Sequence, residues 1–219
     1  MKTLEIIIVS YNSLNWLKKT LDSLNSFYLP YSKYNNIITV VDNASSDNTV
    51  SMLQRHYPKV NLIKSQNNVG FSAGNNLALK QSKADFIMLL NSDTEFNEKS
   101  NIDELLKYLE NDETIGIITP KLVLSDGEMD KACHRGEPGL LDSLFYFAGL
   151  EKIFPKIKFF TKYHLLHKNL TEIHEVDAVT GACMIMRNKT LKEIGYFDER
   201  FFMYSEDMDL CRRFRQNGY

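Results

Sequence analysis

The sequence has few cysteines, no long apolar run and no excess of charge of one sign. Its three cysteines form no C-x-x-C pair and leave one over, so we expect no disulfide framework and a reducing, cytoplasmic compartment. No apolar stretch has the length of a transmembrane helix, and no signal peptide is expected. With 26 basic and 28 acidic side chains, the net charge of −2 gives no general attraction to nucleic acid or to an anionic membrane.

Two nucleotide-binding signatures are also missing. A nicotinamide-binding Rossmann enzyme needs a G-x-G-x-x-G run after its first strand, but residues 10–13 read Ser-Tyr-Asn-Ser. A nucleotidyltransferase shares the sheet expected below, yet usually carries a glycine- and arginine-rich loop at this point, and residues 10–13 offer none. The length of 219 residues, with 43% apolar and 25% charged residues, fits one globular domain, or one domain built of two fused halves.

What the sequence does have is an alternation of apolar runs with helix-like segments over its first 120 residues. Short, β-branched runs predict strands at 4–9, 37–41, 60–64, 86–90 and 116–119. Helical spacing and capping residues predict helices at 16–24, 47–57 with Ser46 or Asp47 as the cap, 72–83 and 102–110. This order favours an α/β fold with a Rossmann-like, twisted, mostly parallel sheet flanked by helices.

The run Phe86–Leu90 is apolar throughout and reads as a strand buried on both faces. Asn91, Ser92 and Asp93 follow it directly. If the backbone stays extended, Asn91 and Asp93 point to the same side, and their oxygens suit Mg²⁺ or Mn²⁺. The alternative is a polar strand end that caps the next turn.

Three of the predicted strands end in polar side chains. They are followed by Ser10 to Asn12, by Asp42 and Asn43, and by Asn91 to Asp93. Because ligands of open α/β sheets bind at the carboxyl ends of the strands, this pattern predicts a small-molecule pocket along that edge.

From residue 121 onward the alternation is lost, and we expect a smaller, less regular region. Aromatic and basic residues gather at 144–147 and 154–163. Such a stretch is more often a packed subdomain with snorkelling lysines, and peripheral contact with a membrane surface is the alternative. His164, His167 and His174 have a loosely metal-like spacing, but without matched cysteines or carboxylates a structural zinc site is not expected.

The last 40 residues predict a strand and two helices. Residues 179–186 are predicted to form a small-residue turn that enters an apolar strand, and a short helix at 189–194 ends at Gly195. A final helix opens at Ser205 or Glu206 and ends near Gly218, with acids in its first turn and arginines in its last. Acids at that place stabilise the helix dipole, which is the alternative to a catalytic role.

Taken together, these motifs resemble the family 2 glycosyltransferases, sugar-nucleotide-dependent enzymes of the GT-A fold. The matching stretches, in the order of that family, are IIVSYN at 7–12, VVDNASSD at 40–47, NNVGFSAGN at 67–75, LNSD at 90–93, GACM at 181–184, FDERFF at 197–202 and EDMDL at 206–210. Within the family, the sequence most resembles bacterial enzymes that add rhamnose or similar sugars to polysaccharides.

The resemblance implies a role for each matching residue on the donor side. Tyr11 and Asn12 would belong to the pocket for the base and ribose, and Asp42 would accept a hydrogen bond from uracil or thymine. The remaining donor-side residues would be Asn68 and Gly70 in the loop beside the nucleotide and Ser92 between the two metal ligands, Asn91 and Asp93. Here Asn91 replaces the first acid of the family's D-x-D motif, so Asp93 is the one charged ligand for Mg²⁺ or Mn²⁺.

On the acceptor side, Gly181 would let the backbone approach the substrate. Asp207 would be the catalytic base, Glu206 would bind the acceptor, and Asp209 could instead pair with an arginine. The reaction implied is a single displacement with inversion. Residues 1–120 would form the nucleotide-sugar half and residues 121–219 the acceptor-binding and catalytic half.

The expected partners are therefore a dTDP- or UDP-linked sugar, with rhamnose as the candidate, and a saccharide or lipid-linked saccharide acceptor, in the cytoplasm or at the inner face of the membrane. Family members normally continue with a further strand and a histidine, so the resemblance implies that 1–219 is truncated. A catalytically idle nucleotide-sugar-binding domain and a nucleotidyltransferase stay as alternatives.

Overall fold

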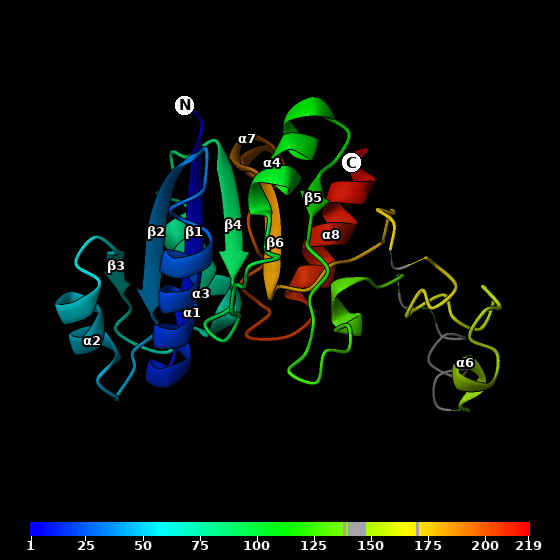
Figure 1. The fold of residues 1–219 in the computed structure, drawn as a ribbon, viewed down its shortest axis with the longest axis horizontal. Coiled ribbons are helices and arrows are strands. Elements are labelled where there is room, and N and C mark those ends of the chain that lie inside the picture. Colours follow the sequence, from blue (N-terminus) through cyan, green and yellow to red (C-terminus); the bar gives the residue numbers. More distant parts are fainter. Residues whose placement is uncertain (138, 140–147, 170) are drawn as a thin grey trace.

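The computed structural model describes residues 1–137, 139, 148–169 and 171–219 (Figure 1). The predicted stretch 144–147 lies outside them. In the described residues the elements are β1 Thr3–Ser10, α1 Leu14–Phe27, β2 Asn35–Asp42, α2 Thr49–His56, β3 Asn61–Lys64, α3 Gly70–Leu79, β4 Phe86–Leu90, α4 Ile102–Asn111, β5 Ile117–Ile118, the 3-10 turn η1 Lys131–Cys133, α6 Leu150–Ile153, β6 Cys183–Arg187, α7 Asn188–Ile194 and α8 Glu206–Gln216.

A single sheet organises these elements, in the order β3-β2-β1-β4-β6-β5. Strands β1 to β4 pair in parallel, whereas β6 runs antiparallel to both β4 and β5. The mostly parallel α/β sheet predicted from the sequence is therefore confirmed. Strand β6 comes from the second half of the chain, so both halves contribute to the same sheet (Figure 1).

Both faces of the sheet are covered by helices, which explains the uninterrupted apolar runs of the central strands. On one face Ile6, Ile8 and Met88 pack with residues of α1 and α4 such as Leu21 and Leu106. The other face carries the alternate strand residues, packed against α3, α7 and α8 through Ile7, Leu89, Leu79, Leu191 and Leu210. This two-sided burial holds the strands firmly, so their carboxyl ends are fixed positions for functional side chains.

Two predicted helix boundaries are wrong. Helix α3 spans Gly70–Leu79 and not 72–83, because Gly70, with a φ of +82°, already opens it inside the stretch that was interpreted as a loop. Helix α2 has Asn48 at its N-cap in place of Ser46 or Asp47. Asp47 still contributes, since its Oδ1 accepts from Thr49 N at 3.0 Å.

Between β5 and β6 the described chain is largely irregular. A short hairpin-like bridge joins Val123 to Met129, and the segment that contains α6 extends from the end of the molecule farthest from α2 and β3 (Figure 1). None of the helices in the described part of the chain is long and apolar enough to cross a membrane.

Candidate active site

The loops after β1 and β2 are tied together at the carboxyl edge of the sheet. Ser10 and Asp42 are register partners at the ends of these strands. Asn12, with a φ of +49°, accepts from Ser46 N on its Oδ1 at 2.8 Å, and its own N–H donates to Ser45 Oγ at 3.0 Å. The predicted residue Asn12 therefore shapes this edge through its amide oxygen. Tyr11, beside it, is half exposed.

Asp42 presents a buried carboxylate oxygen that lacks a hydrogen-bond partner. The residue is 3% exposed; its Oδ2 accepts from Ser45 N at 3.3 Å, while Oδ1 has no donor among the described residues. An orphaned buried acceptor is costly, so it favours a ligand that brings an N–H group. The resemblance to family 2 glycosyltransferases implies that Asp42 accepts a hydrogen bond from a uracil or thymine ring, and this role stays a prediction.

Asn43 organises the loop before α3, a role that the sequence analysis did not assign. Its Nδ2 donates to Asn68 Oδ1 at 2.9 Å and to Gly70 O at 3.0 Å, and its Oδ1 accepts from Val69 N at 3.0 Å. Asn68 Oδ1 also accepts from Gly70 N at 3.0 Å. The structure thus places the predicted pair Asn68 and Gly70 directly beside the end of β2.

Gly70 is also the point where the loop before α8 meets α3. A Cβ built on Gly70 would lie 2.3 Å from Phe202 O, so a larger residue does not fit without a shift. Phe202 O accepts from Phe71 N at 2.7 Å. The glycine therefore permits a close backbone contact between two loops that are 130 residues apart in the sequence.

The residues after β4 form a turn and not the extended stretch that the sequence analysis assumed. Thr94 N donates to Asn91 O at 3.3 Å, which closes the turn around Ser92 and Asp93. The argument that Asn91 and Asp93 share one side because the backbone is extended is therefore wrong. Ser92 contributes its carbonyl, which accepts from Thr20 Oγ1 at 2.9 Å and joins the turn to α1.

The donor atoms left at this turn fit a cation that completes its shell from substrate and water. Asp93 is exposed and its carboxylate has no hydrogen-bond partner in the described chain, and Asn91 is half-buried beside it. No group of three or more His, Cys, Asp or Glu residues that could hold a metal occurs among the described residues. One carboxylate and one amide are oxygen ligands of the kind that would suit Mg²⁺ or Mn²⁺ bound together with phosphates.

Asp207, at the start of α8, is held by three donors. Its Oδ2 accepts from Arg135 Nη2 at 2.6 Å and from Gly181 N at 3.3 Å, and its Oδ1 accepts from Met208 N at 2.7 Å. Burial lowers the pKa of Arg135, but the Asp207 carboxylate more than offsets this and raises that pKa above its usual value. The Asp207 carboxylate therefore stabilises the charged form of Arg135.

The neighbouring acids differ in their surroundings. Glu206 is 7% exposed, and its Oε2 has no partner in the described part of the chain. Burial raises the pKa of Glu206, and the charge of Asp207 adds to that rise. Asp209 points away into an ion pair, with its Oδ2 2.9 Å from Arg213 Nε, which confirms the alternative interpretation of that residue.

The turn that precedes these acids is conformationally strained. Tyr204 and Ser205 have φ values of +73° and +69°, in the left-handed region that non-glycine residues seldom adopt. Strain of this kind persists where the surrounding structure fixes the backbone. The sequence carries no signal for it, since neither residue is glycine or asparagine.

Two sets of hydrogen bonds link the predicted residues into one edge. Asn12, Asp42, Asn68 and Gly70 are joined through the loops after β1 and β2. On the other side of β1, Asn91 N donates to Ala182 O at 3.0 Å, and the adjacent Gly181 reaches Asp207. Arg135, the partner of Asp207, was missed because nothing in its irregular segment marks it.

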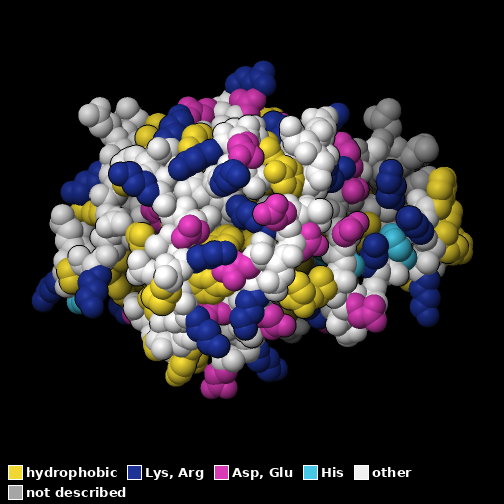
Figure 2. Space-filling view, turned by 90° about the horizontal axis from the view of Figure 1, so that it is seen from above, with side chains coloured by type: hydrophobic (Ala, Val, Ile, Leu, Met, Phe, Trp, Pro, Cys, Tyr) yellow, Lys and Arg dark blue, Asp and Glu magenta, His cyan; other side chains and the backbone are white. Residues whose placement is uncertain are grey.

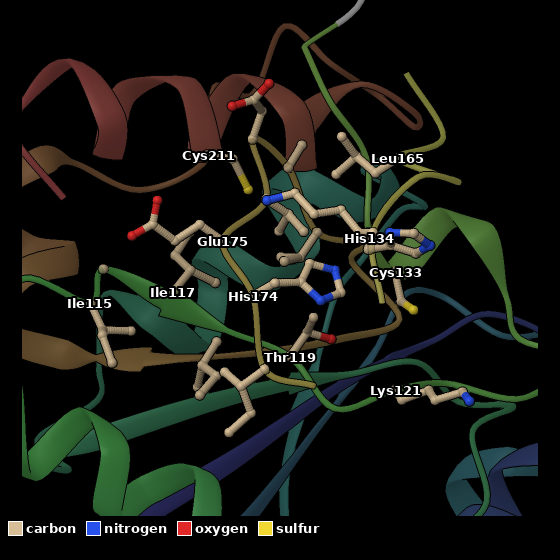
Figure 3. Close-up of a pocket in the computed structure, with 18 of the residues that line it drawn as sticks. Ile115, Ile117, Thr119, Lys121, Cys133, His134, Leu165, His174, Glu175 and Cys211 are labelled. Atoms are coloured by element: carbon tan, nitrogen blue, oxygen red, sulfur yellow. The ribbon is translucent and has the colours of Figure 1, made fainter. Parts of the chain in front are cut away.

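The protein also contains a cavity of about 1060 Å³ (Figure 3). It is bounded by β5, by α8 and by residues 158–179, and none of the predicted site residues line it. His134, in its wall, is 5% exposed, and both ring nitrogens lack partners among the described residues. Burial lowers the pKa of His134 to about 4, with a smaller contribution from His174, whose ring is 5.6 Å away.

Comparison with known proteins gives a family match over most of the chain. Residues 5–195 match Glycosyl transferase family 2. Over 228 residues the chain is 27% identical to the N-acetylglucosaminyl-diphospho-decaprenol L-rhamnosyltransferase of Mycobacterium tuberculosis, covering 99% of this chain and 71% of that protein. It is 30% identical over 226 residues to rhamnosyltransferase WbbL of Escherichia coli, covering 97% of this chain and 77% of that protein.

Other relatives are longer than this chain. The low-salt glycan biosynthesis hexosyltransferase Agl10 of Haloferax volcanii is 29% identical over 221 residues, which cover 98% of this chain but 62% of that protein.

Mannosyltransferase PcManGT from Pyrobaculum calidifontis, solved with GDP-Man and Mn²⁺, has a TM-score of 0.65 at 16% identity, covering 99% of this chain and 52% of that one. Staphylococcus aureus TarS 1-349 has a TM-score of 0.63 at 21% identity, covering 98% of this chain and 55% of that one. These structures confirm the predicted GT-A fold.

Proposed function

The chain belongs to glycosyl transferase family 2, and from this premise we propose that it moves a sugar, with inversion, from a uridine or thymidine diphosphate sugar to an acceptor hydroxyl. The acceptor would be a saccharide or lipid-linked saccharide in the synthesis of a cell-surface polysaccharide or glycan. The rhamnosyltransferases among its relatives support rhamnose as the sugar.

The observation that carries this proposal is the unpartnered Oδ1 of Asp42 at the end of β2. Uracil and thymine both present a ring N–H at the position where adenine has an acceptor. A buried carboxylate oxygen that accepts this N–H gains a charge-assisted hydrogen bond and loses the penalty of an orphaned acceptor. Tyr11 and Asn12, which lie at the same edge, would border the base and ribose.

Asp93 and Asn91 would hold a divalent cation together with the donor diphosphate. When bound, such a cation stabilises the negative charge that develops on the leaving diphosphate. The protein side of this arrangement is the turn at 91–94, which is fixed to α1 by Ser92 O and to the 181–182 backbone by Asn91 N. Ser92 therefore serves by positioning the two ligands.

Asp207 would act as the general base. As the acceptor oxygen forms its bond to the anomeric carbon, the bond from that carbon to the diphosphate oxygen breaks, its electron pair leaves with the diphosphate, and the acceptor proton passes to the carboxylate. Arg135 and Gly181 N orient the Asp207 carboxylate before the reaction. Glu206, with its free buried oxygen, would contact the acceptor.

A combined binding and turnover assay tests the proposal. The protein is screened with UDP-, dTDP- and GDP-sugars and Mn²⁺ for thermal stabilisation, since a bound ligand raises apparent stability. Donors that bind are then assayed for transfer, and the anomeric configuration of the product is read by NMR. Stabilisation by UDP- or dTDP-sugars and an inverted product are expected. Binding without turnover would point to an idle nucleotide-sugar-binding domain. Equal stabilisation by ADP-sugars, added to the screen because adenine has an acceptor at that ring position, would contradict the role of Asp42.

A further inference from the structure

One end of the molecule leaves a run of large apolar side chains in solvent. Ile153, Phe154, Ile157 and Phe159 are 65%, 42%, 45% and 61% exposed. They lie within seven consecutive residues, in the segment that projects from the sheet (Figure 1). Single exposed apolar side chains are common on protein surfaces, but a cluster of them marks an interaction surface. The packed subdomain favoured by the sequence would have buried them.

The same segment is basic and has no acid within it. Residues 152–169 contain five lysines and no aspartate or glutamate, although the whole chain has a net charge of −2. Two acids flank the segment in the sequence: Glu151 is buried and paired with His164 at 2.9 Å, and Glu172 accepts from Asn169 Nδ2 at 2.8 Å. Figure 2 shows apolar side chains beside Lys and Arg side chains at the end of the molecule where this segment lies.

Hydrogen bonds fix this segment to the part of the chain that carries Arg135. Gly136 N donates to Tyr163 O at 2.7 Å, and a Cβ on Gly136 would lie only 2.1 Å from Lys162 O. Within the segment, the buried Thr161 hydroxyl bonds to Ile157 O at 3.1 Å and to His167 Nδ1 at 3.0 Å. The segment that carries the exposed apolar run is therefore joined, through Lys162 and Tyr163, to the stretch of chain beside Arg135.

We propose that Ile153, Phe154, Ile157 and Phe159, with Lys156 and Lys158, form a surface that docks the protein on a bilayer containing anionic lipid. A bilayer interface receives both kinds of side chain at once, because apolar groups enter below the headgroups while lysine ammonium groups stay at the level of the phosphates. The core of a protein interface is depleted of lysine, so alternating lysines fit a protein partner less well.

This surface goes beyond the proposed function and does not depend on it. If the acceptor is lipid-linked, a point that rests on the proposed function, docking through this surface would bring its headgroup to the side of the molecule where Arg135 holds Asp207. The binding itself can be measured without any donor or acceptor, so failure of one proposal is distinguishable from failure of the other.

Vesicle co-sedimentation tests the surface directly. The protein is mixed with vesicles of phosphatidylcholine alone or with one-third phosphatidylglycerol, at low and high salt. We expect binding to the anionic vesicles that weakens with salt. Because each lysine near an anionic surface strengthens partitioning about five-fold, the double variant Lys156→Glu/Lys158→Glu should bind at least about 25-fold more weakly. Ile153→Ser/Ile157→Ser should also bind at least about ten-fold more weakly.

Matched controls separate this surface from general effects of charge and hydrophobicity. Lys59→Glu/Lys64→Glu makes the same change of net charge at the opposite end of the molecule, and Val123→Ser/Leu124→Ser removes two apolar side chains of similar exposure. Both should bind like the unmodified protein. Absence of binding to anionic vesicles, or equal losses in the controls, would overturn the proposal. So would a dimer in sedimentation velocity that Ile153→Ser/Ile157→Ser abolishes, because that result would assign the surface to a second copy of the chain.

Discussion

Arg135 Nη2 lies 2.6 Å from Asp207 Oδ2, although 72 residues separate the two in the sequence. Both side chains are largely buried, at 13% and 12% exposure. Arg135 also donates to Val179 O at 2.9 Å, and its backbone pairs with Ala178. The ion pair thus joins the irregular middle segment, the approach to β6 and the start of α8.

Removing one member of this pair should destabilise the protein. Arg135→Met would leave the Asp207 charge buried without its cation, so we expect the free energy of unfolding to fall by about 3 kcal/mol in urea titration. Arg135→Lys restores the charge but cannot serve both acceptors in the same geometry, and should recover part of the loss. The effect of Arg135→Met on the free energy of unfolding should be measured in the unmodified protein and in the Asp207→Asn variant. If the loss were the same in both, the two residues would not be coupled.

The pyrimidine contact can be tested by calorimetry. Asp42→Ala should weaken UDP or dTDP binding about 10- to 100-fold, the factor expected for one charge-assisted hydrogen bond. Asp42→Asn keeps an oxygen for Ser45 N and provides a milder control. ADP should bind more weakly than UDP to the unmodified protein, and equal affinities for the two nucleotides would remove the basis for this role.

The proposed metal ligand is exposed, so its substitution should spare the fold. Asp93→Asn should abolish the increase in nucleotide affinity that Mn²⁺ gives, while the urea midpoint stays unchanged. Glu95→Gln, an equally exposed acid two residues away, is the matched control and should keep the increase. Identical nucleotide affinity in EDTA and in Mn²⁺ for the unmodified protein would refute a metal role.

The assignment of the base makes a distinct kinetic prediction. Asp207→Asn should lower kcat by about 10²- to 10⁴-fold, the usual contribution of general base catalysis, with little change in donor affinity. Asp209→Asn breaks the pair with Arg213 and should act mainly on stability. Near-normal turnover of Asp207→Asn, together with an inactive Glu206→Gln variant, would transfer the role of base to Glu206.

His134 should make stability depend on pH. Its pKa of about 4 in the folded protein lies below the ordinary value of 6.5, because burial disfavours the charged ring. The unfolded chain therefore binds the proton more tightly, so stability is fully present above pH 6.5 and falls as the pH drops toward 4, by up to about 3 kcal/mol. His134→Gln should flatten this dependence in urea titrations from pH 7 to 4. The exposed His56→Gln is the control, and a flat profile for the unmodified protein would contradict the argument.

Local patterns in the sequence were sufficient to predict the sheet. The apolar run of β4 and the polar residues after β1, β2 and β4 follow from strand burial and from where loops leave a sheet, so they can be read from neighbouring residues. The carboxyl edge with Asp42 and Asn91 was predicted for the same reason. Family resemblance added Asp207, whose acid could otherwise have been an ordinary helix cap.

What the sequence did not predict depends on contacts between distant segments. The role of Asn43 depends on the loop at 68–70, which only the folded chain brings beside it. The role of Arg135 likewise depends on its contact with Asp207. The turn at 91–94 and the left-handed Tyr204 and Ser205 are likewise set by tertiary contacts and not by turn-forming residues. Periodicity reports burial along one element and carries no information on such pairings.

The place of β6 in the sheet has a consequence for how the chain is made. Strand β6 pairs with β4 through matches such as Leu90 with Cys183, and it separates β4 from β5. During synthesis, about a hundred further residues must follow β4 before β6 can pair with it and cover its open edge. Such distant pairing slows folding and leaves an aggregation-prone edge exposed. We therefore expect a fragment ending at residue 120 to be insoluble alone. A second half supplied separately would have to bind before the open edge of β4 pairs with the same edge of another copy.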